Sequence, residues 1–188
     1  MTLCFTTLKL HPFAEEDLFA YYRAFRSIFR DVVGLLEIDY IGLTLINTHN
    51  QVLFFSSYPS IEYNILEQDL WHQDPCLSEA FHVQGKLQFW HNLYQPMDDT
   101  ILLYYKKEKP AFSLGFSMPD KYRNYTLVYS YGLKHATAST KYDIDNNQQI
   151  LKNMGRYCVN AISELVPYLS NKIHSLKKPS LTLVINNK

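Results

Sequence analysis

The sequence lacks the features that would assign it to several common classes of protein. It has no net charge, because 18 basic residues balance 18 acidic ones, whereas a domain that binds nucleic acid by itself is usually basic. No apolar run approaches the about 18 residues of a membrane span, and no signal-peptide pattern opens the sequence. We therefore expect a cytoplasmic protein that contacts neither DNA nor a membrane through this chain alone.

Cysteine is scarce, and sequence motifs for catalysis are missing. Cys4, Cys76 and Cys158 are odd in number and far apart, which argues against a disulfide framework and favours a reducing compartment. There is no glycine-rich phosphate loop and no Gly-x-Ser-x-Gly elbow. His72 is close to Cys76 in sequence, but neither an oxyanion-hole motif nor a third orienting group accompanies this pair. The histidine spacing does not suit a metal either. The sequence thus predicts no catalytic residue, no metal site and no cofactor.

The chain is instead rich in core material. Its 188 residues suit a single domain, and 47% of them are hydrophobic. The 15 tyrosines and 11 phenylalanines are able to line a binding pocket, but filling a core is the commoner use of such rings. Composition alone therefore leaves a pocket and a solid core as alternatives.

Hydrophobic periodicity predicts the order helix, hairpin, helices, hairpin, helix. The expected elements are an amphipathic helix at 15–36, a hairpin at 39–57, a helix before Asp74-Pro75, a helix at 100–109 with Lys106 in its last turn, strands at 111–118 and 125–132, and a helix from Asp143 or Asp145 that kinks or breaks at Pro167. This order predicts an α/β fold, an α-β-α sandwich with a central, mainly antiparallel sheet, similar to GAF and PAS sensor domains.

Two of the expected strands carry small side chains on one face. Gly42 and Thr44 leave space above the first strand of the hairpin, and Gly115 lies among small residues on the strand at 111–118. Small residues allow a helix to approach closely, or they leave a cavity. Close contact is the commoner of the two explanations.

Four landmarks follow one another along the chain in a characteristic order. Tyr58 ends an apolar strand, Asp74 precedes a proline after a short helix, Trp90 stands in LQFW, and Gly115 stands in FSLGFSMP. In this order and spacing they resemble the ligand-binding domain of LuxR-type quorum-sensing transcription factors. The resemblance covers nearly the whole chain, roughly residues 18–173.

The resemblance implies a small acylated signal that is buried between the sheet and the helices. Asp74 would accept the amide N–H of the ligand, Trp90 would form a wall, and Tyr58 would offer its hydroxyl at the mouth. Ser130 or Tyr131 would supply a further hydroxyl. Without the resemblance, Asp74 would be expected to cap a local turn, which is a common use of Asp before Pro.

The sequence departs from the family at the positions that read a homoserine lactone. Ile61 and Ile65 stand where the family has a tryptophan and a tyrosine, and Glu62 or Tyr63 takes the first place if the segment is one residue short. An apolar side chain cannot donate to the lactone carbonyl. We therefore predict poor binding of acyl-homoserine lactones. The expected signal is an acylated, apolar or aromatic molecule with one amide or hydroxyl donor aimed at Asp74.

The resemblance also sets expectations for domains and partners. Residues 1–176 are expected to form the sensor domain, and residues 177–188 a linker toward a DNA-binding helix-turn-helix domain that this sequence does not contain. The sequence would then be part of a longer regulator, or a stand-alone sensor that pairs with one. The family implies that ligand binding promotes folding and a homodimer, formed through the last helix or the first.

A GAF- or PAS-like interaction module without a small ligand is the alternative. A fully packed space beside Gly115 would favour that module. A cavity lined by Tyr58, Asp74 and Trp90 would favour the sensor.

Overall fold

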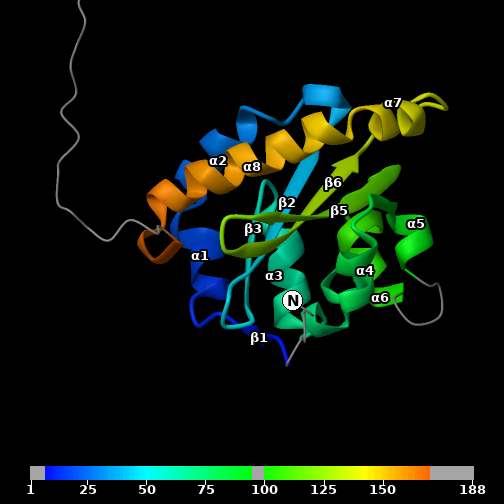
Figure 1. Cartoon of the computed structure of the whole chain (residues 1–188). Helices are drawn as coiled ribbons and strands as arrows, with labels where there is room; N and C mark the ends of the chain where they lie inside the picture. Colours follow the sequence, from blue (N-terminus) through cyan, green and yellow to red (C-terminus); the bar gives the residue numbers. More distant parts are fainter. Residues whose placement is uncertain (1–6, 95–99, 170–188) are drawn as a thin grey trace, which may run out of the picture.

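The structure is a computed structural model that describes residues 7–94 and 100–169 (Figure 1). Within them, six strands form one sheet in the order β1-β3-β2-β6-β5-β4. The pair β1 and β3 is parallel, and the other neighbours are antiparallel. The strands are β1 (Lys9–Leu10), β2 (Tyr40–Ile46), β3 (Gln51–Ser56), β4 (Gln88–Phe89), β5 (Leu114–Tyr122) and β6 (Tyr125–Leu133). The expected linker at 177–188 lies outside the described residues.

Helices cover both faces of this sheet. The α-helices are α1 (Ala14–Ala20), α2 (Tyr22–Arg30), α3 (Pro59–Glu67), α4 (Glu79–Gln84), α5 (Trp90–Leu93), α6 (Thr100–Leu103), α7 (Thr140–Asn146) and α8 (Gln148–Leu165). The 3-10 turns are η1 (Leu35–Glu37), η2 (Trp71–Gln73), η3 (Pro75–Leu77) and η5 (Pro167–Leu169), and η4 (Tyr104–Glu108) is π-helical. This arrangement confirms the predicted α-β-α sandwich. No helix of the described ranges has the length and hydropathy to span a membrane.

The alternation of side chains along β2 divides the core into two layers. Ile41, Leu43 and Leu45 pack with α2 and α8, which lie together across one face of the sheet (Figure 1). Tyr40 and Ile46 point to the opposite face, toward α3 and the short helices that follow it. Successive side chains of a strand point to opposite faces, so Gly42 and Thr44 belong to this second layer. The candidate site lies there.

The expectation of one helix at 15–36 is wrong. The helix breaks at Tyr21, ends at Arg30, and is followed by a left-handed Gly34 with φ of 94°. The physical reason lies in the two core layers. Leu18 packs into the layer of α3, whereas Phe25 and Phe29 pack into the layer of α8. A straight helix would not present one apolar stripe to both layers.

The strand expected at 111–118 begins three residues later and is longer. Strand β5 continues through Pro119, where the β4 side of β5 no longer has a partner because β4 pairs only with Phe116 and Ser117. Proline is tolerated at such an edge because no ladder hydrogen bond is lost. Phe112 lies before the strand and packs in the α3 layer, opposite to the bulky face of β5.

Candidate functional site

Asp74 and Lys106 form a buried ion pair in the layer between the sheet and α3. Their side chains are 9% and 8% exposed. Oδ2 of Asp74 accepts a hydrogen bond from Nζ of Lys106, and Oδ1 accepts from the hydroxyl of Tyr94 at 2.9 Å. Nζ of Lys106 also donates to the Tyr94 hydroxyl at 2.6 Å. Three side chains from separate segments thus form one closed polar cluster.

Asp74 also caps the local backbone. It sits between η2 and η3 in an extended conformation, and its Oδ1 accepts from the backbone N–H of Cys76 at 3.0 Å. This is the local turn that the residue type predicts before proline. Burial opposes ionisation of Asp74, but the Lys106 ammonium and the hydrogen bonds from Cys76 and Tyr94 outweigh it, so the pKa of Asp74 is lowered. The carboxylate is therefore ionised and already bound by three protein groups.

Lys106 was not identified as a site residue from the sequence. It was expected to complement the helix dipole in the last turn of a helix, whereas the structure buries it against Asp74. Burial favours the neutral amine, but the charge of Asp74 prevails and the pKa of Lys106 is raised. One sequence signal points to its burial. Lys106 follows Leu102 by one helical turn, and Leu102 is buried.

A second buried pair, Tyr40 and Glu62, lies beside the first. The Tyr40 hydroxyl donates a hydrogen bond to Oε1 of Glu62. Gly42 gives this pair its room, because a Cβ at that position would lie 2.2 Å from the Tyr40 hydroxyl. Oε2 of Glu62 has no hydrogen-bond partner among the described residues. The sequence indicates Glu62 only as an alternative to Ile61 at the first ligand position.

Burial raises the pKa of Glu62 from 4.5 to about 7, although Tyr40, Ser56 and Lys106 all favour the ionised form. A carboxyl group whose pKa is raised by folding stabilises the fold most below its unfolded pKa. This stabilisation is lost as the pH rises through 7. Asp17, whose pKa is raised to about 6 by burial and by Glu16, contributes in the same direction.

The variant Glu62→Gln isolates the contribution of Glu62 to this pH dependence. Because Gln mimics the protonated form, we expect the variant to be more stable than the wild type by about 2–4 kcal/mol at pH 8. The two proteins should converge near pH 4.5. Denaturant unfolding at several pH values measures the difference, and the exposed Glu67→Gln on the same helix is the control. An equal pH dependence in wild type and Glu62→Gln would contradict the assignment.

The two pairs border a small interior cavity of about 20 Å³. Its walls are Tyr40, Gly42, Thr44, Phe54, Glu62, Ile65, Leu66, Asp74, Lys106 and Ser130. A space of this size holds roughly one water molecule. Pockets for drug-sized ligands measure about 300–1,000 Å³. The cavity is therefore a polar niche inside a packed layer.

Six of the predicted site residues lie in this layer. Ile65, Asp74 and Ser130 line the cavity itself, and Ile61 is buried in the same layer. Trp90 donates its indole N–H to Ser117 at 2.8 Å, and Ser117 is hydrogen-bonded to Ser130 at 2.9 Å. The indole ring covers Gly115 so closely that a Cβ there would lie 1.9 Å from it. The space beside Gly115 is thus packed, in agreement with the commoner reason for a small residue.

Tyr58 and Tyr63 lie outside this layer. They are 40% and 38% exposed, and the Tyr63 ring packs against Phe19 while its hydroxyl donates to Glu67. The structure therefore does not bring these two tyrosines together with Asp74 and Trp90.

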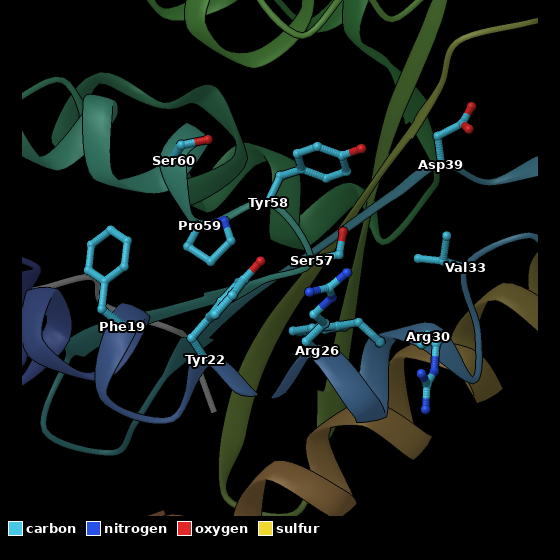
Figure 2. Close-up of a pocket in the computed structure, with 11 residues that line it drawn as sticks. Phe19, Tyr22, Arg26, Arg30, Val33, Asp39, Ser57, Tyr58, Pro59 and Ser60 are labelled. Carbon is cyan, nitrogen blue, oxygen red and sulfur yellow. The ribbon is translucent and has the colours of Figure 1, made fainter. Parts of the chain in front are cut away.

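Tyr58 borders an open groove between α2 and the start of α3 (Figure 2). This outer groove measures about 670 Å³, and Figure 2 shows Tyr22 and Arg26 extending toward Ser57 at its centre. Its lining residues are Phe19, Tyr22, Arg26, Phe29, Arg30, Val33, Asp39, Ser57, Tyr58, Pro59 and Ser60. The groove is the larger of the two spaces, and it combines aromatic rings with two arginines.

The pair of Cys76 and His72 does not have the geometry of a nucleophile and its base. The Cys76 thiol is buried 3.6 Å from the Tyr94 hydroxyl, and burial raises its pKa to about 12. His72 is exposed and lies 3.6 Å from Asp69. A thiol with so high a pKa is protonated at neutral pH. Within 7–94 and 100–169, no group of three or more acidic, histidine or cysteine side chains could hold a metal ion.

The described residues thus form a mainly antiparallel sheet with helices on both faces, and a polar cluster lies under one helical layer. No protein-family model matches the sequence, and no curated protein sequence matches it. Several solved structures match the fold of the chain. The N-acylhomoserine lactone dependent LuxR family transcription factor CepR2 from Burkholderia cenocepacia is 14% identical, with a TM-score of 0.58 over 80% of this chain and 96% of that chain.

Two structures of SdiA are also similar. Escherichia coli SdiA is 14% identical, with a TM-score of 0.56 over 90% of this chain and 72% of that chain. SdiA in complex with octanoyl-rac-glycerol is 15% identical, with a TM-score of 0.53 over 80% of this chain and 65% of that chain. At such low identity, the TM-scores show a common fold and nothing further. They confirm the fold that the resemblance to LuxR-type ligand-binding domains predicted.

Proposed function

We propose that this chain is the small-molecule-sensing domain of a LuxR-type transcriptional regulator and that it has no catalytic role. The observation that carries the proposal is the buried polar cluster of Asp74, Lys106, Tyr40 and Glu62, between the sheet and α3. Buried charges and unpaired polar atoms are unfavourable in a layer that serves packing alone. Proteins of the same fold include one that depends on N-acylhomoserine lactones and one in complex with an acylglycerol.

The proposed ligand contacts are Ile61, Ile65, Asp74, Trp90, Gly115 and Ser130, and we place Tyr58 and Tyr63 at the entrance. The cavity of about 20 Å³ is too small for an acyl chain. Binding therefore has to move the layer of α3 and η4 away from the sheet. In this proposal the ligand replaces side-chain packing by its own apolar contacts, which links occupancy to the position of α3.

A thermal-shift screen of the whole chain tests this proposal. It would contain acyl-homoserine lactones, acylglycerols and aromatic amides. A ligand at about 100 times its Kd adds roughly 2.7 kcal/mol of stability, which is a rise in Tm of about 5–10 °C for a chain of this size. We expect such a rise from at least one compound, and less from the lactones, because Ile61 and Ile65 donate no hydrogen bond. A screen without any stabilising compound would contradict the proposed sensor.

The proposal includes a cytoplasmic regulator that forms a homodimer and reaches DNA through a helix-turn-helix domain outside this sequence. Helix α8 carries the apolar surface that suits a dimer. Ile150, Tyr157 and Leu165 are 47%, 44% and 41% exposed. Ile150 and Tyr157 also line a surface groove between α8 and the residues directly after α2, Asp31 and Val32. Exposed apolar patches of this kind often mark interaction sites.

Self-association through α8 is a separate prediction. We expect light scattering to show a mass that increases with protein concentration, and Ile150→Glu to shift this increase to higher concentrations. A charge at an apolar interface weakens association because it is desolvated without a partner. The variant Gln149→Glu adds the same charge at the neighbouring exposed position and serves as control. A strict monomer at high concentration would contradict the dimer.

A second candidate function rests on the packed space beside Gly115 and on the outer groove. A GAF- or PAS-like module that binds a protein segment needs no interior ligand. Tyr22, Tyr58 and the arginines Arg26 and Arg30 offer the aromatic and cationic surface that interfaces favour. Under this candidate, substitution of Arg26 and Arg30 would abolish partner binding, and no small molecule would stabilise the chain.

A further inference from the structure

Glu62 holds the one acceptor atom of the cavity wall that is buried without a partner within the described residues. The residue is 7% exposed, and its Oε2 accepts no hydrogen bond, whereas Oε1 is bound by Tyr40. Glu62 lines the same small cavity as Lys106, Thr44 and Ser130. A buried acceptor without a hydrogen bond destabilises the fold by the full free energy of removing that atom from water. A group that donates a hydrogen bond in the cavity would remove this penalty.

Asp74 offers no comparable opening. Both of its oxygens are already bound, one by Lys106 and the other by Tyr94 and the backbone of Cys76. A ligand donor would have to compete with a buried ammonium for this carboxylate. The Lys106 ammonium, by contrast, has three N–H donors, of which Asp74 and Tyr94 take two. Among the described residues, the cavity wall thus has one buried acceptor without a partner, on Glu62, and beside it the Lys106 ammonium, one N–H of which is taken by neither Asp74 nor Tyr94.

The size and charge of the cavity restrict the group that fits. About 20 Å³ accommodates an atom group the size of water. A carboxylate would meet the carboxyl group of Glu62, and an ammonium group would meet Lys106. A neutral hydroxyl donates one hydrogen bond and accepts others, so it satisfies Glu62 and Lys106 together.

We propose that the cavity between Glu62 and Lys106 binds a hydroxyl group of an uncharged, apolar ligand, with Glu62 as the acceptor that determines specificity. This inference rests on the proposed sensor function and names its ligand class, an alcohol or polyol with an apolar chain. The chain of the ligand passes along Phe54, Ile65 and Leu66, which form the apolar wall of the cavity. Asp74 acts in this site as the residue that positions Lys106.

Two esters of one fatty acid test the proposal. 1-Octanoylglycerol has two hydroxyl groups, whereas methyl octanoate has the same acyl chain and no hydrogen-bond donor. Isothermal titration of the whole chain measures both affinities. We expect the wild type to bind 1-octanoylglycerol at least about tenfold more tightly, since one hydrogen bond to an otherwise unpaired buried acceptor accounts for such a factor.

The variant Glu62→Gln tests whether this acceptor is responsible. Its carbonyl oxygen still accepts from Tyr40, but an NH₂ group replaces the free oxygen, so we expect the preference to fall to within about threefold. Glu67→Gln, an exposed change on the same helix, should keep the wild-type preference. The unfolding transition of each variant checks that it is folded.

The outcomes separate this inference from the function on which it rests. Equal binding of both esters, or an unchanged preference in Glu62→Gln, would overturn the role of Glu62 and leave the sensor in place. Loss of the preference in Asp74→Asn but not in Glu62→Gln would show that Asp74, and not Glu62, accepts the hydrogen bond of the ligand hydroxyl. Binding of neither ester by the wild type would overturn the ligand class, and only a screen without any stabilising compound would overturn the sensor.

Discussion

Replacing Asp74 with alanine is expected to lower the free energy of unfolding by about 3–5 kcal/mol, because it leaves the Lys106 ammonium buried without its counter-ion. The pair is nearly inaccessible to solvent, and Lys106 donates to Asp74 and Tyr94. Removing one partner of a buried pair is more harmful than removing both. Denaturant unfolding measures the loss, and Asp145→Ala, an exposed change on α7, is expected to stay within about 0.5 kcal/mol of the wild type.

The double variant Asp74→Ala with Lys106→Met separates the charge from the packing. Methionine is an unbranched side chain only one atom shorter than lysine and carries no charge, so we expect the double variant to recover most of the stability that Asp74→Ala loses. Two contacting residues of one network should show a large coupling energy. Two results would show that the ion pair does not organise this layer. One is that the losses in unfolding free energy of the two single variants add up in the double variant. The other is a loss below about 1 kcal/mol for Asp74→Ala.

Trp90→Ala is the second change with a large expected effect, a loss of about 3–5 kcal/mol. The indole is 1% exposed, lies over Gly115, and donates to Ser117. Its removal leaves a large void and takes one of the two hydrogen bonds of the Ser117 hydroxyl, which keeps its bond to Ser130. Tyr104→Ala, which removes an aromatic ring that is 46% exposed, should have a small effect and is the control.

Gly115→Ala provides the complementary test of this contact. In the wild type the added methyl group would overlap the Trp90 ring, and overpacking of this kind lowers stability by about 1–3 kcal/mol. In the Trp90→Ala background the same methyl group enters vacant space, so we expect little or no further loss. If Gly115→Ala lowers stability equally in the wild type and in Trp90→Ala, a group other than the Trp90 ring limits the space at Gly115.

The sequence allowed the fold to be predicted because its signals are local. The alternation at 111–118 and the hairpin at 39–57 depend on neighbouring residues, and both appear in the sheet. Helix boundaries depend on which core layer receives each apolar residue. For that reason the break at Tyr21 was missed, since Leu18 and Phe25 belong to different layers.

The candidate site was predicted only in part, because its contacts join distant segments. The resemblance to LuxR-type domains singled out Asp74 as a ligand contact, whereas its place before a proline predicted the local turn with Cys76 that the structure shows. Its partner Lys106 is 32 positions away, and nothing in the sequence indicates that these two residues meet. Glu62 pairs with Tyr40 on another element, so its burial could not be derived from the apolar pattern of α3.

The central claim is an interior site for a small molecule, and an amide NMR titration of the whole chain with 1-octanoylglycerol tests it most directly. The account predicts the largest shift changes at Glu62, Ile65, Cys76 and Ser130, which surround the cavity or adjoin its polar cluster. Changes confined to Arg26 and Tyr58 would place the ester in the outer groove. That result, or an unchanged spectrum, would contradict the interior site.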